Sequence, residues 1–170
     1  MSNEDGIAAD GEQFLIHENH GEWLVSWHPP VGVPEGIRHG AEGICVTESG
    51  DTVVISRDGK TWELPAGRPE GDESWEQTLQ REVSEEACSV VVEARLPGFT
   101  RGECVKGHQT GAVLVRSRWL ADVQLLPWEP RFEITHRRVV PLAQLRVELQ
   151  VAASPFAPLI RRALSEANIL

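Results

Sequence analysis

The sequence is poor in cysteine, in positive charge and in long hydrophobic runs, and each shortage excludes a class of protein. Its three cysteines, Cys45, Cys88 and Cys104, are widely spaced and form no Cys-x-x-Cys pair, so neither a disulfide framework nor a structural zinc site is expected. Acidic residues outnumber basic ones by 26 to 16, and no basic patch of the kind that binds nucleic-acid phosphates is visible. No apolar run approaches the roughly 18 residues of a membrane span.

These absences leave an acidic globular chain. Its 170 residues, 41% hydrophobic and 25% charged, match one domain of ordinary composition. The net charge of -10 favours a site in which a cation meets an anionic ligand. The N-terminus has no apolar signal segment, and sparse cysteine suits a reducing compartment, so we expect a cytoplasmic protein. Residues 1–13 are expected to form a flexible tail and residues 14–170 a single domain.

Alternation and turn signals predict a mixture of strands and helices. Strands are expected at residues 22–27, 43–47, 52–56, 61–64, 89–94, 111–119 and 137–140, and helices at 74–87 and 155–167. The strands at 43–47 and 52–56 flank a Glu-Ser-Gly-Asp turn and predict a hairpin. This order indicates an α/β or α+β layered domain.

The helix that begins with Ser74 carries an unusual arrangement of acids. Trp75, Leu79 and Val83 form one apolar stripe at the helical spacing. Glu82 and Glu86 fall on the same stripe, within about 20° of Trp75. Carboxylates are therefore expected to point where the protein interior should be.

Buried carboxylates repel each other and need compensation. Arg81 is the one basic residue within this helix, and its position on the helical wheel points it away from these acids. A divalent cation would solve the problem, since carboxylates at i, i+3 and i+4 suit Mg²⁺ or Mn²⁺. A solvated acidic surface helix is the alternative.

The spacing of these residues resembles the Nudix box. Gly67 is followed after five residues by Glu73, and after seven more by Arg81-Glu82-Val83-Ser84-Glu85-Glu86. Every fixed residue of the box up to that point is matched. The family glycine near the helix end is here Cys88, and the next aliphatic residue is Ser89. A cysteine in the left-handed conformation of that glycine would cost about 1 kcal/mol, so the resemblance leaves the helix ending open.

The resemblance to MutT-like Nudix hydrolases implies both a fold and a site. The implied fold is an α/β/α sandwich with a mixed sheet and a loop-helix-loop catalytic motif at residues 67–89. The implied ligands and catalytic residues are Glu82, Glu85 and Glu86, and the Gly67 carbonyl oxygen is a further ligand. They would bind Mg²⁺ or Mn²⁺, which activates water for attack on phosphorus.

Further roles follow from the same resemblance. Glu129 or Glu133 is the candidate for an extra carboxylate from a later loop, with an ordinary loop acid as the alternative. Glu73 and Arg81 are expected to form an ion pair that supports the site. The sequence has six tryptophans and no tyrosine. Trp27, Trp62 and Trp128 are candidates for a base-stacking platform, with core packing as the alternative.

The expected reaction is hydrolysis of a diphosphate linkage in a nucleoside diphosphate-X type substrate, such as ADP-ribose, an NDP-sugar or a (d)NTP. A non-catalytic Nudix-like ligand-sensing module and an isopentenyl diphosphate isomerase are the alternatives. The isomerase has a cysteine-containing motif with no counterpart around Cys45. The expected partner is a small nucleotide, with neither nucleic acid nor membrane, and a homodimer is left open.

Overall fold

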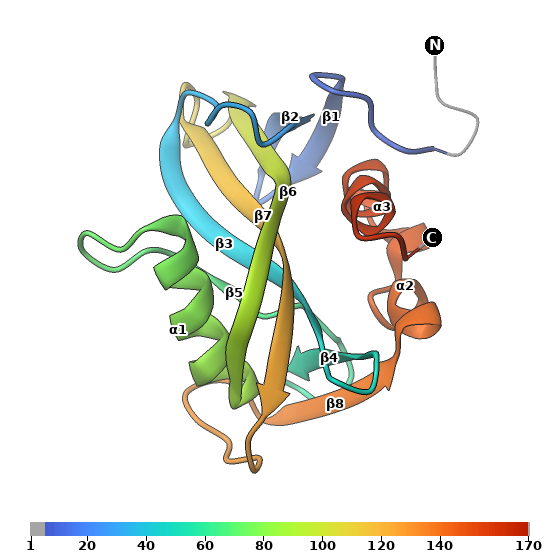
Figure 1. Ribbon diagram of the computed structural model, residues 1–170. Helices are drawn as coiled ribbons and strands as arrows, with labels where there is room; N and C mark the ends of the chain where they lie inside the picture. The colour runs from blue at the N-terminus through green and yellow to red at the C-terminus, as the bar shows by residue number, and fades with distance from the viewer. Residues whose placement is uncertain (1–5, 170) are drawn as a thin grey trace.

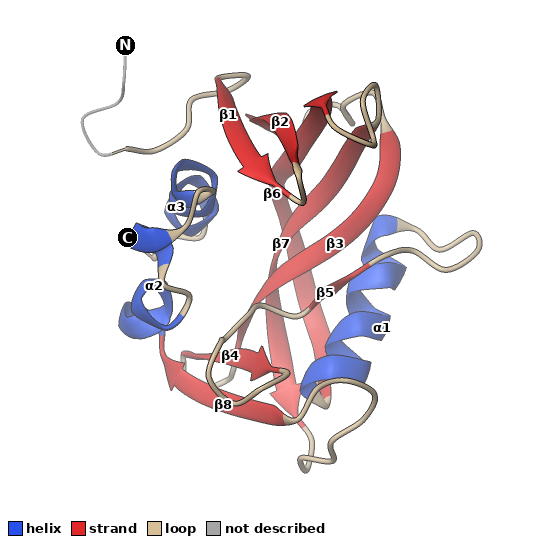
Figure 2. Cartoon of the chain, turned by 180° about the vertical axis from the view of Figure 1, so that it is seen from behind, coloured by secondary structure: helices blue, strands red, loops and turns tan. Residues whose placement is uncertain are grey.

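A mixed sheet runs through residues 6–169, the part of the chain that the computed structural model describes, and helices cover both of its faces (Figures 1 and 2). The strands are β1 (Gln13–Glu18), β2 (Gly21–His28), β3 (Ile37–Val46), β4 (Asp51–Ser56), β5 (Ala66–Gly67), β6 (Ser89–Lys106), β7 (Val113–Leu125) and β8 (His136–Pro141). They lie in the order β1-β2-β6-β7-β3-β4-β8, and β5 pairs with β3 beside this path. The pairing of β3 with β7 is parallel, whereas the other pairings are antiparallel.

The helices divide between the two faces of the sheet. Helix α1 (Trp75–Ala87) covers one face, while the short α2 (Leu145–Glu148) and α3 (Ala157–Glu166) lie on the other (Figures 1 and 2). Beneath α1, Leu79 and Val83 pack with Trp119 and other buried apolar residues. None of the helices in the described range is long and apolar enough to cross a membrane. The expected mixed sheet between helices is confirmed.

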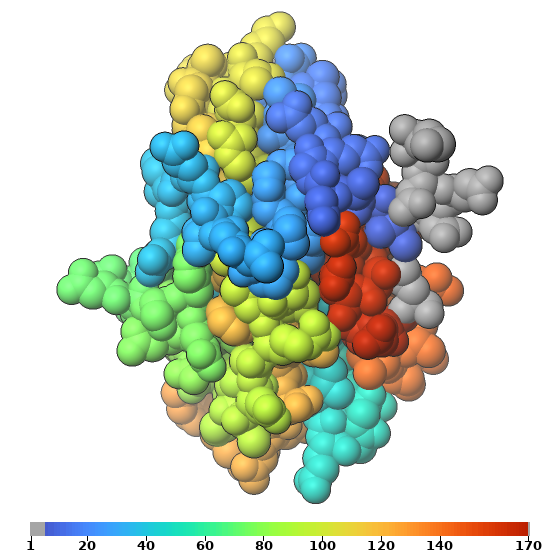
Figure 3. Space-filling model, turned by 45° about the horizontal axis from the view of Figure 1, so that its top comes forward, coloured from blue at the N-terminus to red at the C-terminus, as the bar shows by residue number. Residues whose placement is uncertain are grey.

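The α3 side of the sheet also holds the start of the described chain (Figure 3). Ala8 is buried with Trp27 and Leu159, and Asp10 forms an isolated bridge with Trp27. Residues 1–5 of the expected tail lie outside the described residues. The flexible tail stays a prediction, although within residues 6–13 the apolar side chain of Ala8 is buried against α3.

Most expected elements are present, and the differences have physical reasons. The hairpin of β3 and β4 is confirmed, as are β2, β8 and α3. The strand expected at residues 61–64 is reduced to a single bridge between Ile55 and Glu63, because Pro65 has no N–H to continue a ladder. Strand β6 is longer than predicted, since bulges between Val91 and Glu93 and around Pro97 interrupt the alternation that marks a strand. Strand β7 extends to Leu125, where it still pairs with the start of β6.

Candidate active site

Helix α1 begins as its sequence predicts, and Cys88 shows how it ends. Ser74 Oγ accepts a hydrogen bond from Gln77 N at 3.1 Å, and Gln77 Oε1 accepts one from Ser74 N at 2.9 Å, which completes a capping box. Cys88 ends the helix in the left-handed conformation, with φ 46° and ψ 51°. A glycine adopts this conformation at less cost. Cys88 nevertheless ends the helix at the position where the Nudix box has its glycine.

The acids of α1 lie where the helix meets β5. Leu79 and Val83 are fully buried against the sheet, and Glu86 on the same stripe is only 9% exposed. The side chain of Glu82 is 13% exposed, whereas that of Glu85, at the edge of the stripe, is 33% exposed. These values exclude a fully solvated position for Glu82 and Glu86.

The carboxylates of Glu82 and Glu86 both lie against the backbone of strand β5. A Cβ on Gly67 would lie 2.0 Å from Oε1 of Glu82, so the absence of a side chain is what allows Glu82 to lie against this backbone. The neighbouring Ala66 N donates a hydrogen bond to Glu86 Oε1 at 2.8 Å. Two consecutive residues of the box loop thus hold two carboxylates that are one helical turn apart.

Burial makes the charged form of these acids unfavourable. It raises the pKa of Glu86 to about 7, although the hydrogen bond from Ala66 and the charge of Arg57 act in the opposite direction. Burial also raises the pKa of Glu82. A cation beside the two carboxylates would favour their charged forms.

Arg81 joins the box loop to the helix. Its Nε donates to Glu73 Oε2 at 2.8 Å, and its Nη2 donates to the carbonyl oxygen of Arg68 at 2.8 Å. The expected ion pair with Glu73 is thus present, and the hydrogen bonds from Arg81 are the largest cause that lowers the pKa of Glu73, to about 2. The expectation that Arg81 points away from the other acids is wrong. Its Nη1 lies 2.8 Å from Glu82 Oε1 and 3.2 Å from Glu85 Oε2, because the long side chain reaches neighbouring positions.

Of the two loop acids, Glu133 comes to this cluster and Glu129 does not. Arg57, just after β4, donates to Glu133, and its Nη2 lies 3.8 Å from Glu86 Oε2. The Glu129 carboxylate instead pairs with Arg131 at 3.2 Å. Sequence reasoning does not find Arg57. Its position directly after a buried strand, where loop side chains often line sites, is the signal that could have indicated it.

The donor chemistry fits a hard divalent cation, although the side chains are arranged in ion pairs. Within residues 6–169, no three His, Cys, Asp or Glu side chains are grouped closely enough to hold a metal ion. Carboxylate oxygens are nevertheless the ligands that Mg²⁺ and Mn²⁺ take. Holding such an ion would require Glu82 and Glu85 to exchange Arg81 for it. The Gly67 carbonyl oxygen faces Gly40 of β3, and its role as a ligand stays a prediction.

A cavity of about 520 Å³ opens beside these acids and is lined by Gly67 and Glu86. Arg57 also lines it, as do three further basic side chains: His39 from β3, Arg68 from the box loop and Arg116 from β7. Burial, followed by the charges of Arg116 and Arg68, lowers the pKa of His39, which reflects how close the three groups are. Sequence reasoning misses them because they come from three separate segments and share no local motif. We call this cavity the first cavity.

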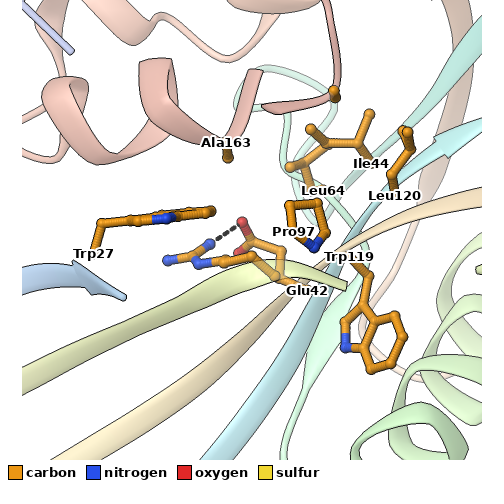
Figure 4. A pocket seen from close by; sticks show the side chains of 10 residues that line it. Trp27, Glu42, Ile44, Leu64, Pro97, Trp119, Leu120 and Ala163 are labelled. Atoms are coloured by element: carbon orange, nitrogen blue, oxygen red, sulfur yellow. Dashed lines mark hydrogen bonds and ion pairs between the residues drawn. The ribbon is translucent and has the colours of Figure 1, made fainter. Parts of the chain in front are cut away.

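Among the three candidate tryptophans, Trp62 lines the first cavity and the other two do not. Trp62 is half-buried, and the guanidinium of Arg138 lies 4.2 Å from its ring centroid. Trp27 is fully buried and lines a much smaller pocket next to Glu42 (Figure 4). Trp128 is half-buried and packs against the cluster beneath α1.

Comparison with known proteins shows a family match and a shared fold. A family model described as the NUDIX domain matches residues 37–162. A mutant of the Bacillus subtilis pyrophosphohydrolase BsRppH is 16% identical with a TM-score of 0.69, over 91% of this chain and 96% of its own. A NUDIX hydrolase from Nitrosomonas europaea is 16% identical with a TM-score of 0.58, over 78% of this chain and 89% of its own.

A third structure comes from a study of MutT from Aliivibrio salmonicida and Vibrio cholerae. It is 21% identical with a TM-score of 0.52, over 75% of this chain and 97% of its own. No curated protein sequence matches the chain. At these identities the solved structures show a shared fold, and the matched family model includes the whole box.

Proposed function

The chain belongs to the Nudix family, and we propose that it is a metal-dependent hydrolase that cleaves the diphosphate linkage of a nucleoside diphosphate-X type substrate. ADP-ribose, an NDP-sugar and a (d)NTP are examples of that class. One observation carries the proposal: Glu82 and Glu86 are buried against β5, beside the first cavity. Carboxylates are rarely buried unless they are paired, and a divalent cation would be a stronger partner for two of them than the single guanidinium of Arg81.

We propose that Glu82, Glu85 and Glu86, with the Gly67 carbonyl oxygen, hold Mg²⁺ or Mn²⁺. When bound, the ion supplies Lewis acidity and neutralises charge on the diphosphate oxygens. A carboxylate oxygen of the cluster takes the proton of the attacking water. Glu133, which Arg57 connects to Glu86, is the loop acid placed to share this role.

The basic side chains of the first cavity supply substrate binding in this proposal. Arg68 and Arg116 donate to phosphate oxygens, and His39, which lines the same cavity from β3, donates a further hydrogen bond. The pair of Glu73 and Arg81 holds the box loop against α1. The basic side chains thus bind and orient the diphosphate, while the acids of α1 hold the metal ion and accept the proton of the attacking water.

Two alternatives fit the structure less well. A ligand-sensing module would not need the full set of box acids, and this chain retains Glu82, Glu85 and Glu86. An isomerase that uses a reactive cysteine is disfavoured at Cys45, because its side chain is fully buried and burial raises its pKa to about 12.

The test is a nucleotide panel assayed with Mg²⁺ and with Mn²⁺, with products separated by chromatography. We expect cleavage of a phosphoanhydride, and loss of about 100-fold or more in kcat for Glu86→Gln. The melting temperature of this variant without metal should stay level or rise, because a desolvated charge is removed. Glu76→Gln, the same change on the exposed side of α1, is the control and should behave as wild type. Hydrolysis of phosphate monoesters alone, with every diphosphate inert, would exclude the proposal.

A cytoplasmic location and a small-molecule partner remain part of the proposal. The three cysteines are free and buried, which suits a reducing compartment. The net charge of -10 disfavours binding to nucleic acid or to an anionic membrane surface.

A further inference from the structure

A second cavity of about 510 Å³ continues the first one along the sheet face that α3 covers. Both cavities are lined by His39, Arg116 and Ile160, and also by the acids Glu42 and Glu63. The second cavity also reaches Trp23 and Gly102. The shared residues therefore separate the acids beside Gly67 from an aromatic region farther along one continuous cleft.

Aromatic side chains form the walls of the second cavity. Trp23 on β2 and Phe156, just before α3, are both half-buried and pack against the same apolar cluster. Gly102 on β6 lies opposite Val25 in the sheet. A Cβ on Gly102 would meet Cε3 of Trp23 at 3.5 Å and Cγ2 of Val25 at 3.8 Å. A side chain at position 102 would therefore extend over the Trp23 ring, which the glycine leaves open to the cavity.

Ion pairs lie between the two ends of the cleft, where Glu63 faces Arg57 and Glu42 faces two arginines. Arg116 Nη1 is 3.3 Å from Glu42 Oε2, and Arg118 bonds to the other oxygen of the same carboxylate. One carboxylate is thus shared by two guanidinium groups, so Arg116 retains capacity to bind a further anion. A phosphate group at this position would connect a ligand in the second cavity to the acids of the first.

We propose that the second cavity is a nucleobase site, in which a planar heteroaromatic ring stacks on Trp23 beside Phe156 and above Gly102. This inference rests on the proposed function and deepens it. The substrate is a nucleotide whose base occupies the second cavity, while Arg116 contacts its phosphates and its diphosphate reaches the first cavity. Glu18 and Asn19 also line the second cavity and offer hydrogen-bonding groups to the edge of the base.

Trp62 is the rival stacking platform. The Arg138 guanidinium lies 4.2 Å from its ring centroid, and the His136 ring packs against it edge-on with 6.4 Å between the ring centroids. These neighbours take up surface that a base would need, whereas Gly102 keeps Trp23 accessible. The two platforms predict opposite responses to substitution.

The experiment measures equilibrium binding of AMP, GMP, CMP, UMP and ribose 5-phosphate by calorimetry. Ribose 5-phosphate carries the sugar and phosphate without a base. We expect wild type to bind at least one nucleotide about tenfold or more tightly than ribose 5-phosphate, as a stacked base should give. In Trp23→Ala and in Gly102→Leu this difference should disappear.

Gly102→Leu keeps the test decisive even if Trp23→Ala fails to fold. The added Cβ makes only ordinary van der Waals contacts, while the rest of the side chain fills the space above Trp23. Gly32→Leu is the matched control, because nothing lies within 4 Å of a Cβ at that exposed glycine. It should retain the full preference for nucleotides.

Two results would overturn the inference. One is a wild type that binds no nucleotide better than ribose 5-phosphate at millimolar concentration. The other is a preference that survives Gly102→Leu and is lost in Trp62→Ala. Failure of the proposed hydrolysis would be seen separately, in the nucleotide panel, and would leave a Trp23-dependent binding result intact.

Discussion

The absence of a side chain at Gly67 allows the carboxylate of Glu82 to lie against β5. A Cβ there would lie 2.0 Å from Oε1 and 2.1 Å from Cδ of Glu82, so Gly67→Ala must displace Glu82 from β5. Misplacing a group of the site by about 1 Å can reduce turnover roughly 100-fold, and we expect a loss of this order in kcat. Gly32→Ala is the control. Steady-state kinetics with circular dichroism would test it, and a folded Gly67→Ala variant with normal kcat would contradict this role of the glycine.

Asp58 organises the turn that follows Arg57. Its Oδ1 accepts hydrogen bonds from Thr61 N and Lys60 N, both at 2.8 Å, and these bonds lower the pKa of Asp58 from 3.8 to about 2. Because the folded-state pKa lies below the unfolded value, the carboxylate stabilises the fold above about pH 4, and this contribution is lost as the pH falls toward about 2.

Asp58→Asn should therefore lower the denaturant midpoint near neutral pH, because the charged acceptor is lost. The gap to wild type should close as the pH falls through that window. Chemical denaturation of both proteins over a series of pH values measures this, and a gap that stays constant would show that the charge of Asp58 does not stabilise the turn.

Residue spacing alone predicts part of the site. Glu82 and Glu86 are found because helical periodicity places them on the stripe of Leu79, and their burial agrees. His39 and Arg116 are not found, because they meet only when β3 and β7 pair in parallel. A single sequence carries no local signal for such long-range pairing.

Among the elements, the end of α1 depends on a residue that is strained for its type. Cys88 has a φ of 46°, its Sγ lies 3.2 Å from the Glu129 carbonyl oxygen, and Arg137 donates to the carbonyl oxygens of Ala87 and Cys88. Arg137 thus satisfies the end of a helix whose own last turn has no basic residue. The Cys88 side chain and its backbone conformation act on stability in opposite directions.

Two substitutions separate these effects. Cys88→Ala removes the thiol and keeps the backbone strain, whereas Cys88→Gly removes both. We expect Cys88→Gly to be more stable than Cys88→Ala by about 1 kcal/mol, with both variants as active as wild type, since water attack needs no thiol. Chemical denaturation gives the stability difference. Loss of activity in both variants would instead assign the thiol to the reaction.

Element boundaries were predictable where one signal dominates. The capping box of Ser74 and Gln77 fixes the start of α1, and the turn around Gly50 fixes the hairpin. Strand β1 (Gln13–Glu18) has no such signal and forms because β2 supplies a partner along its whole length. Strand β6 (Ser89–Lys106) has two bulged regions that break its alternation. For this reason the sequence pattern predicts a short strand followed by irregular structure instead of one long strand.

On the scale of the whole molecule, α3 forms one wall of the cleft that the two cavities make. Ile160 lines both cavities, and Phe156 lines the second. The position of α3 therefore helps to shape the proposed substrate site. The α1 side carries the acids, so in the proposed function the two helical layers contribute different groups from opposite faces of the sheet.

Arg162 attaches α3 to the rest of the molecule. Its side chain, 17% exposed, donates to Ala8 O at 2.9 Å and to Asp10 Oδ1 at 2.7 Å, and its guanidinium lies 5.5 Å from the Trp27 ring centroid. Arg162→Ala should lower the free energy of unfolding by about 2 kcal/mol, because hydrogen bonds to a charged group are lost. Because α3 then holds Ile160 less firmly over the cleft, KM for a nucleotide should rise while kcat changes little. Arg161→Ala, on the same helix, is the control for loss of an arginine. An equal fall in kcat and kcat/KM, without a change in KM, would mean that α3 acts on the acids rather than on nucleotide binding.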